Sequence, residues 1–227
     1  EWQGDLSGAV NPATLVMDSA KTVTGVFALE EHTLTTAVTG SGSIDPPAGA
    51  HSYGHGVDVT VTATPDAGWR FAGWSGDLSG TTNPDVITMD SDQAATAIFE
   101  EIPVYDLTTE VQGNGSVDPA GATSHEEGTA VTLTATPDEH WVFVEWQGDL
   151  SGSENPTPLT MDSAKTVTAV FELEEHTLIV GVTGSGSTDP AGENTYPYGT
   201  EVTVTATADA DWGFVEWQGD LSGSENP

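Results

Sequence analysis

The side chains best suited to chemistry lie in a loop, Gly-Asp-Leu-Ser-Gly-x-x-Asn-Pro, that recurs along the 227-residue chain. Each copy offers a carboxylate and an amide oxygen close to glycines, and Ca²⁺ takes about six to eight oxygen ligands. Calcium is therefore the one cofactor that the sequence suggests. The candidate ligands are Asp5, Asn11, Asp77, Asn83, Asp149, Asn155, Asp220 and Asn226.

A purely structural role competes with calcium binding for these side chains. Asp and Asn also stabilise tight turns by accepting hydrogen bonds from nearby backbone amides. We favour this interpretation because a strong calcium loop carries more carboxylates at fixed short spacing. Further carboxylates would join only if a neighbouring Met-Asp-Ser turn folds back, namely those of Asp18, Asp90 and Asp162.

Other residues give little support for catalysis. The chain has no cysteine, which removes thiolate nucleophiles, thiolate metal sites and disulfides. His51 and His55 lie close together in a glycine-rich stretch, but no other repeat has this pair. Near-identical repeats also provide no unique pocket for a substrate. We therefore expect a protein that is not an enzyme.

A repeat of about 72 residues carries these loops. Its most recognisable motif, Trp-x-Gly-Asp-Leu-Ser-Gly, begins at Trp2, Trp74, Trp146 and Trp217. A period of this length is typical of a tandem array of small modules. The predicted segments are the C-terminal part of a repeat at 1–30, complete repeats at 31–103 and 104–175, and the N-terminal part of a repeat at 176–227.

The partial repeats leave two alternatives open. In the first, which base rates for tandem arrays favour, the residues belong to a longer repetitive polypeptide. In the second, residues 1–27 of one subunit supply the strands that the last half-repeat of another lacks. Strand addition of this kind would propagate a fibre head to tail.

Apolar and polar residues alternate over short stretches of residues 104–174, which is the pattern of half-buried β-strands. No stretch has the apolar period of a helix, so the sequence predicts an all-β fold. About five strands are expected, at 107–111, 131–136, 141–146, 159–161 and 167–171. The Gly-rich and Pro-containing stretch 113–121 is expected to be a loop.

The tryptophans are expected to centre the cores. Phe143 and Trp146 lie three residues apart, so both can face inward only if a bulge interrupts the strand near Val144 and Glu145. We expect the second tryptophan of each pair to be buried, and the first to be partly exposed. The buried set is Trp74, Trp146 and Trp217, and the partly exposed set is Trp69, Trp141 and Trp212.

The chain is strongly acidic, with 36 Asp and Glu against three basic residues and a net charge of −33. Such a surface repels nucleic acid and anionic membranes, and no apolar stretch is long enough to insert into a bilayer. The linkers at 28–31 and 172–175 are short, acidic and without Gly or Ser. We therefore expect beads on a semi-rigid rod.

The order of motifs resembles the divergent internalin-type B-repeat, also called the bacterial repeat domain. The resemblance lies in Val-Thr-Leu-Thr-Ala-Thr-Pro at 131–137, Trp-x-Phe-x-x-Trp-x-Gly-Asp at 141–149 and Val-Thr-Ala-Val-Phe at 167–171, and it extends over nearly the whole chain. It implies secreted or surface-anchored prokaryotic proteins that use such modules as stalks, spacers and adhesive segments. It also implies a β-grasp-like module or a small sandwich, and no general catalytic residues.

These features together predict an extracellular or cell-surface structural protein. Tandem β modules would form a stalk, fibre or sheath, with copies of the chain as partners and calcium as a candidate bridge. The alternative is a cell-surface adhesin or carbohydrate-binding module that holds surface glycans through exposed tryptophans.

Overall fold

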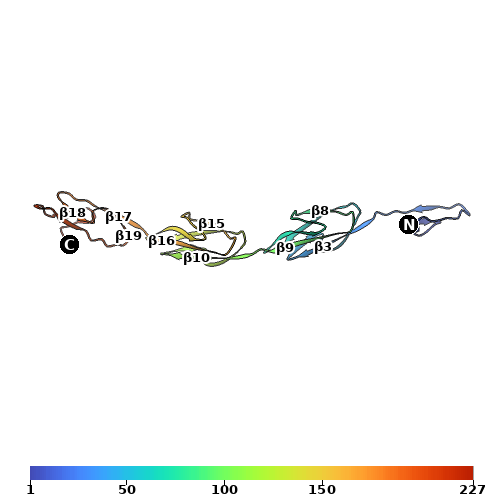
Figure 1. Ribbon diagram of the computed structural model, residues 1–227, viewed down its shortest axis with the longest axis horizontal. Coiled ribbons are helices and arrows are strands. Elements are labelled where there is room, and N and C mark those ends of the chain that lie inside the picture. Colours follow the sequence, from blue (N-terminus) through green and yellow to red (C-terminus); the bar gives the residue numbers. More distant parts are fainter. Residues whose placement is uncertain (227) are drawn as a thin grey trace. The chain divides into compact units, whose positions relative to one another are not determined.

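The computed structural model describes residues 1–226, and every regular element within them is a β-strand (Figure 1). The chain divides into two compact units, Glu1–Ile102 and a second that begins at Pro103. Each unit holds one complete module and one partial module. The all-β fold and the tandem organisation predicted from the sequence are confirmed.

The first complete module, residues 31–102, consists of two sheets. The larger sheet has the order β5-β3-β9-β7, in which β3 and β9 are parallel and the other neighbours antiparallel. Its strands are β3 (Glu31–Thr39), β5 (Gly49–Gly54), β7 (Trp69–Gly76) and β9 (Gln93–Glu101). The smaller sheet, of order β4-β6-β8, contains β4 (Gly42–Asp45), β6 (Asp58–Pro65) and β8 (Asp85–Thr88).

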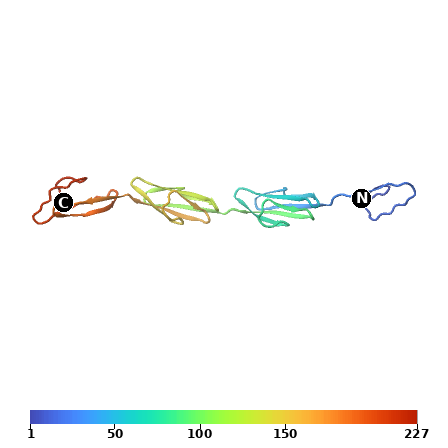
Figure 2. The same cartoon turned by 90° about the horizontal axis from the view of Figure 1, so that it is seen from above.

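The second complete module, residues 103–173, repeats this topology (Figure 2). Its larger sheet, of order β12-β10-β16-β14, contains β10 (Val104–Gln112), β12 (Gly121–Glu126), β14 (Trp141–Gly148) and β16 (Lys165–Leu173). Its smaller sheet contains β11 (Gly115–Asp118), β13 (Ala130–Pro137) and β15 (Thr157–Thr160). The expectation of five strands is therefore wrong. The two additional strands are β11, inside the expected loop, and β12, which begins at the last residue of that loop.

Both sheets of a module enclose a single core. In the second complete module, alternate residues of β13 and β16 point inward, and the core residues include Val131, Leu133, Val167 and Phe171. Side chains from two sheets that fill one interior define a small sandwich, one of the two architectures expected. Burying a side chain of this size contributes about 1.5–3 kcal/mol, so a few such residues dominate the stability of the module.

The predicted bulge is present. The pairing of β14 with β16 shifts register between Phe143 and Glu145, and the pairing of β7 with β9 shifts at the equivalent place. The shift lets both aromatic rings turn toward the interior, where the ring centroids of Phe143 and Trp146 are 5.0 Å apart. Trp74 and Trp146 are buried, and Trp69 and Trp141 are half-buried, as expected.

The two partial modules form only two-stranded sheets. The N-terminal segment, residues 1–30, pairs β1 (Trp2–Gly4) with β2 (Val23–Gly25). The open module, residues 175–226, pairs β17 (Glu175–Val180) with β19 (Gly192–Pro197), and β18 (Gly186–Asp189) with β20 (Thr205–Ala208). Its Trp217 is half-buried rather than buried, which corrects the expectation. The open module has no counterpart of β16 to cover this indole.

Candidate functional site

In the two complete modules, the aspartate of the Gly-Asp-Leu-Ser-Gly loop fastens that loop to the last strand of the module. The Ala94 amide donates to Asp77 Oδ2 at 2.7 Å, and the Thr166 amide donates to Asp149 Oδ2 at 2.6 Å. In the N-terminal segment, Asp5 accepts the Thr22 amide in the same way, at 2.7 Å. The fourth aspartate, Asp220, is exposed and lines a cavity of the open module.

The asparagine of the same loop bonds to a different strand. Asn155 Oδ1 accepts the Ala135 amide at 2.8 Å, while Asn155 Nδ2 donates to the Ala135 carbonyl at 2.7 Å. The side chain thus imitates one residue of a neighbouring strand. The same pair of bonds joins Asn83 to Ala63 and Asn226 to Ala206. Among residues 1–226, Asn11 makes no such pair of bonds.

The structure therefore gives the Asp and Asn of each complete module separate backbone partners. One oxygen of each side chain already accepts a backbone amide. Within residues 1–226, no group of three or more His, Asp or Glu side chains is placed to hold a metal ion. Calcium binding at these loops stays a prediction.

The aspartates of the Met-Asp-Ser turns close their own turns. Asp162 Oδ1 lies 2.7 Å from Lys165 Nζ, and Asp18 Oδ1 lies 2.8 Å from Lys21 Nζ. The hydrogen bond from the lysine is the main cause that lowers the pKa of both carboxyls below the ordinary value. In the first complete module, Gln93 takes the place of the lysine and donates to Asp90 at 3.0 Å.

The histidines of the glycine-rich stretch do not converge on one point. A ring nitrogen of His51 lies 2.6 Å from the Pro47 carbonyl oxygen. His55 instead meets His32, with 3.1 Å between His55 Nδ1 and His32 Nε2. In the second unit, the ring of His140 stacks on Tyr198 with centroids 3.5 Å apart.

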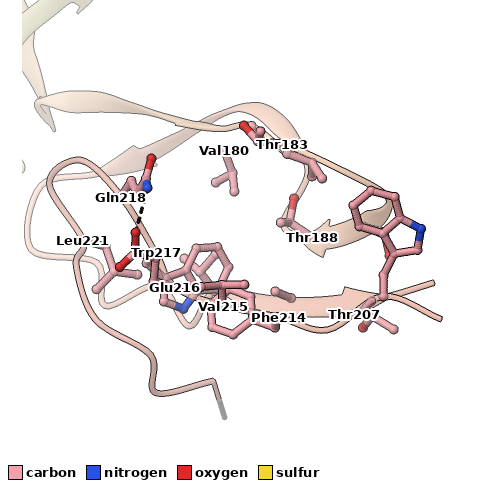
Figure 3. Close-up of a pocket in the computed structure, with 18 of the residues that line it drawn as sticks. Val180, Thr183, Thr188, Thr207, Phe214, Val215, Glu216, Trp217, Gln218 and Leu221 are labelled. Carbon is pink, nitrogen blue, oxygen red and sulfur yellow. Dashed lines mark hydrogen bonds between the residues drawn. The ribbon is translucent and has the colours of Figure 1, made fainter. Parts of the chain in front are cut away.

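The open module contains a cavity of about 630 Å³, which the sequence did not predict. Leu178, Val204 and Ala206 line it, together with the aromatic rings of Phe214 and Trp217. Figure 3 shows Val180 and Thr188 facing Phe214 and Trp217 across the open space. In the second complete module, β16 occupies the corresponding interior with Val167, Ala169 and Phe171. The sequence did contain a signal for this cavity. Residues 145–156 and 216–227 are identical, so the half-repeat can be aligned with a complete repeat and the strands that it lacks can be identified.

A comparison with protein-family models matches the divergent InlB B-repeat domain at residues 32–103, 105–175 and 176–227. The chain belongs to the divergent InlB B-repeat family. Proteins built from this B-repeat are typically surface-associated and non-enzymatic. No curated protein and no solved structure matches the chain. Among the described residues, the B-repeats contain no helix able to span a membrane.

Proposed function

We propose that this chain is an extracellular structural protein whose tandem B-repeats form a stalk, fibre or sheath. The proposal depends on one observation: in the two complete modules, the residues of the repeated motif make structural contacts within the module. The loop aspartate, the loop asparagine and the inner tryptophan all hold the module together. For example, Trp146 Nε1 donates to the Glu154 carbonyl at 2.9 Å, inside the loop that Asp149 and Asn155 fasten.

The short connection between modules supports an array rather than independent domains. In the second unit, Glu174 alone separates β16 from β17. Its amide donates to the His140 carbonyl at 2.9 Å, and its carbonyl accepts the Tyr198 amide at 2.7 Å. The linker is thus a single residue, and both its amide and its carbonyl are hydrogen-bonded. Little flexible chain remains between these successive B-repeats.

The charge suits surroundings that are rich in salt or in calcium. The net charge of −33 is spread over the modules, and dissolved ions screen the self-repulsion that it produces. The same carboxylates attract divalent cations, so calcium bridging between modules or chains is part of the proposal. The N-terminal segment and the open module would be completed by the rest of a longer polypeptide or by a neighbouring subunit.

Negative-stain electron microscopy of the purified chain, with calcium and with a chelator, tests this function. We expect extended particles or filaments, and filaments that shorten in the chelator if calcium bridges them. Compact particles under both conditions would contradict the structural role. Saturable binding to a glycan array by such compact particles would favour the adhesin instead.

A further inference from the structure

In the second unit, the single linker residue is bonded to one residue on each side of the junction. The Glu174 amide donates to the His140 carbonyl at 2.9 Å, and the Glu174 carbonyl accepts the Tyr198 amide at 2.7 Å. His140 belongs to the turn between β13 and β14, and Tyr198 directly follows β19. The linker therefore brings one residue of the second complete module and one residue of the following repeat to the same place.

The side chains of these two residues also contact each other. The imidazole of His140 and the phenol ring of Tyr198 are stacked, with ring centroids 3.5 Å apart and planes inclined by 8°. The His176 ring, on β17, meets Tyr198 edge-on, with centroids 5.9 Å apart. The Tyr198 ring thus contacts one ring of its own repeat and one ring of the preceding module. Aromatic contacts of this kind stabilise beyond the area that they bury.

The backbone of His140 has a conformation that favours glycine. Its φ is 66°, in the left-handed region, and the equivalent residue of the first complete module is Gly68, with a φ of 78°. A residue with a Cβ adopts this conformation less easily than glycine does. Gly68 makes the same backbone bond, because its carbonyl accepts the Ile102 amide at 2.8 Å. The turn and its bond therefore need no imidazole, and the role of the His140 ring lies in the contact with Tyr198.

Two carboxylates lie beside the His140 ring. Glu139 Oε1 is 3.4 Å from His140 Nε2, and Glu174 Oε2 is 3.8 Å from His140 Nδ1. The side chains of His140 and Glu174 are 35% and 42% exposed, so both are partly shielded from water. A carboxylate oxygen near each ring nitrogen limits rotation of the imidazole and keeps its face toward Tyr198.

The backbone part of this arrangement recurs in the other repeats with different side chains. The residue equivalent to Tyr198 is His55 in the first complete module and Glu127 in the second. The His55 amide donates to the Glu30 carbonyl, and the Glu127 amide donates to the Pro103 carbonyl, both at 2.7 Å. The repeats therefore share one backbone connection at their start, and the side chains placed on it differ from repeat to repeat.

We propose that His140 and Tyr198 form an interlock that fixes the orientation of the β17–β19 hairpin against the second complete module. The interaction surface is the turn between β13 and β14 together with the linker, and its partner is the start of the following repeat. The inference deepens the proposed function, because it assigns the stiffness of the array to a particular pair of residues. Histidine at this position provides a ring for the interlock, and glycine, as at Gly68, does not.

Nuclear magnetic resonance of the 227-residue chain tests the contact between the two rings. A phenol ring stacked at 3.5 Å moves the resonances of the His140 ring protons upfield. These resonances should return downfield in Tyr198→Ser, which removes the ring. Tyr198→Phe is the matched control, because it keeps a ring in the same place and should leave the resonances upfield. Unchanged His140 resonances in Tyr198→Ser would show that the rings do not stack.

The distance between two spin labels tests the orientation. The chain has no cysteine, so Thr132→Cys on β13 and Thr195→Cys on β19 introduce the only two labelling sites, both exposed. Electron–electron double resonance on the otherwise unmodified chain should give one narrow distance distribution. His140→Gly should lower the ratio of locked to unlocked junctions by about 2- to 10-fold, the range for one aromatic contact, and so broaden the distribution. Adding Tyr198→Ser should broaden it no further, because both changes remove the same interaction.

Two controls separate loss of the interlock from damage to a module. Hydrogen exchange of β13 and β14 should be as slow in His140→Gly as in the unmodified chain, because glycine suits the conformation of this turn. Asp211→Gly makes the equivalent change in the open module, where φ is 68°, and should leave the distance distribution narrow.

Two results would overturn the inference: an unmodified chain whose distance distribution is already broad, or a His140→Gly chain whose distribution is as narrow as that of the unmodified chain. Either result leaves the stalk standing, because tandem modules joined by flexible junctions still form extended particles in negative stain. Conversely, a narrow distribution that depends on His140, found in compact particles, would support the interlock and contradict the stalk.

Discussion

The second complete module and the open module carry the same ordered motifs, and residues 145–156 are identical to residues 216–227. In the complete module β13 has eight residues and Trp146 is buried, whereas in the open module β20 has four residues and Trp217 is half-buried. The hairpins of the first half of a repeat therefore form without counterparts of β15 and β16. Without these closing strands, the module has no closed core. The last strand of a repeat makes the core.

The largest expected difference concerns the phenylalanine of that last strand. Phe171 is 2% exposed and Phe27 is 94% exposed. Phe171→Ala should lower the free energy of opening of the second complete module by about 3–5 kcal/mol, because it leaves a cavity in the core. Phe27→Ala, measured on the monomeric chain at low concentration, should change the free energy of opening of the N-terminal segment by less than about 0.5 kcal/mol. Hydrogen exchange read by mass spectrometry resolves the modules separately. Equal effects of the two changes would break the comparison.

A smaller difference is expected for the loop asparagine. Asn155→Ala removes both bonds to Ala135 and leaves that residue's amide and carbonyl unpaired, which costs about 1–3 kcal/mol in the complete module. Asn11→Ala should have an effect within about 0.5 kcal/mol, because this exposed side chain lacks the pair of backbone bonds that Asn155 makes. Exchange protection of the Ala135 amide is the direct measurement, and unchanged protection in Asn155→Ala would show that the amide bonds elsewhere.

The loop aspartate should show a smaller contrast still. Asp149→Ala removes the acceptor of the Thr166 amide at the surface, with a loss of about 1 kcal/mol. Asp220→Ala should have no measurable effect on the monomer, because Asp220 lacks the backbone amide donor that Asp149 has in Thr166. Urea unfolding followed by tryptophan fluorescence compares the two variants with the unmodified chain. If calcium binds these loops, both changes should instead weaken binding in a calcium titration.

The smallest effect on stability is expected at the Met-Asp-Ser turn. Here the complete module and the N-terminal segment make the same contact, between Asp162 and Lys165 and between Asp18 and Lys21. Hydrogen bonds from Lys165 and Ser163 lower the pKa of Asp162 below its ordinary value of 3.8 in the folded chain. The ionised carboxylate therefore favours folding above the unfolded pKa, and this contribution is lost as the pH falls through the folded pKa. Lys165→Gln, which copies Gln93 of the first complete module, should raise the pKa of Asp162 in an NMR titration. An unchanged pKa would show that the lysine does not act on the carboxyl.

Much of the fold could be predicted because its determinants are local. Alternation located β13 and β16, and the three-residue spacing of Phe143 and Trp146 located the bulge. β11 and β12 were missed because their sequences, Gly-Ser-Val-Asp and Gly-Ala-Thr-Ser-His-Glu, look like turns. These strands exist because β13 and β10 offer them hydrogen bonds, and this tertiary effect overrides their weak propensity.

The candidate site was harder to interpret from sequence for a related reason. An aspartate and an asparagine in one glycine-flanked loop look like ligands of one ion. The structure directs Asn155 to Ala135, twenty residues away, and Asp149 to Thr166, seventeen residues away. Only the pairing of distant strands reveals these partners. The cavity of the open module depends in the same way on strands that lie far apart in the sequence.

The parallel pairing within each complete module determines how it responds when its two ends are pulled apart. β10 is the first strand of its module and β16 the last, and they run side by side in the same direction from Leu107 and Lys165 onward. Tension would slide these strands past each other along their axes. All the hydrogen bonds between them would then be loaded in shear together, instead of breaking one after another. A chain of such modules would carry tensile load through its closing strands.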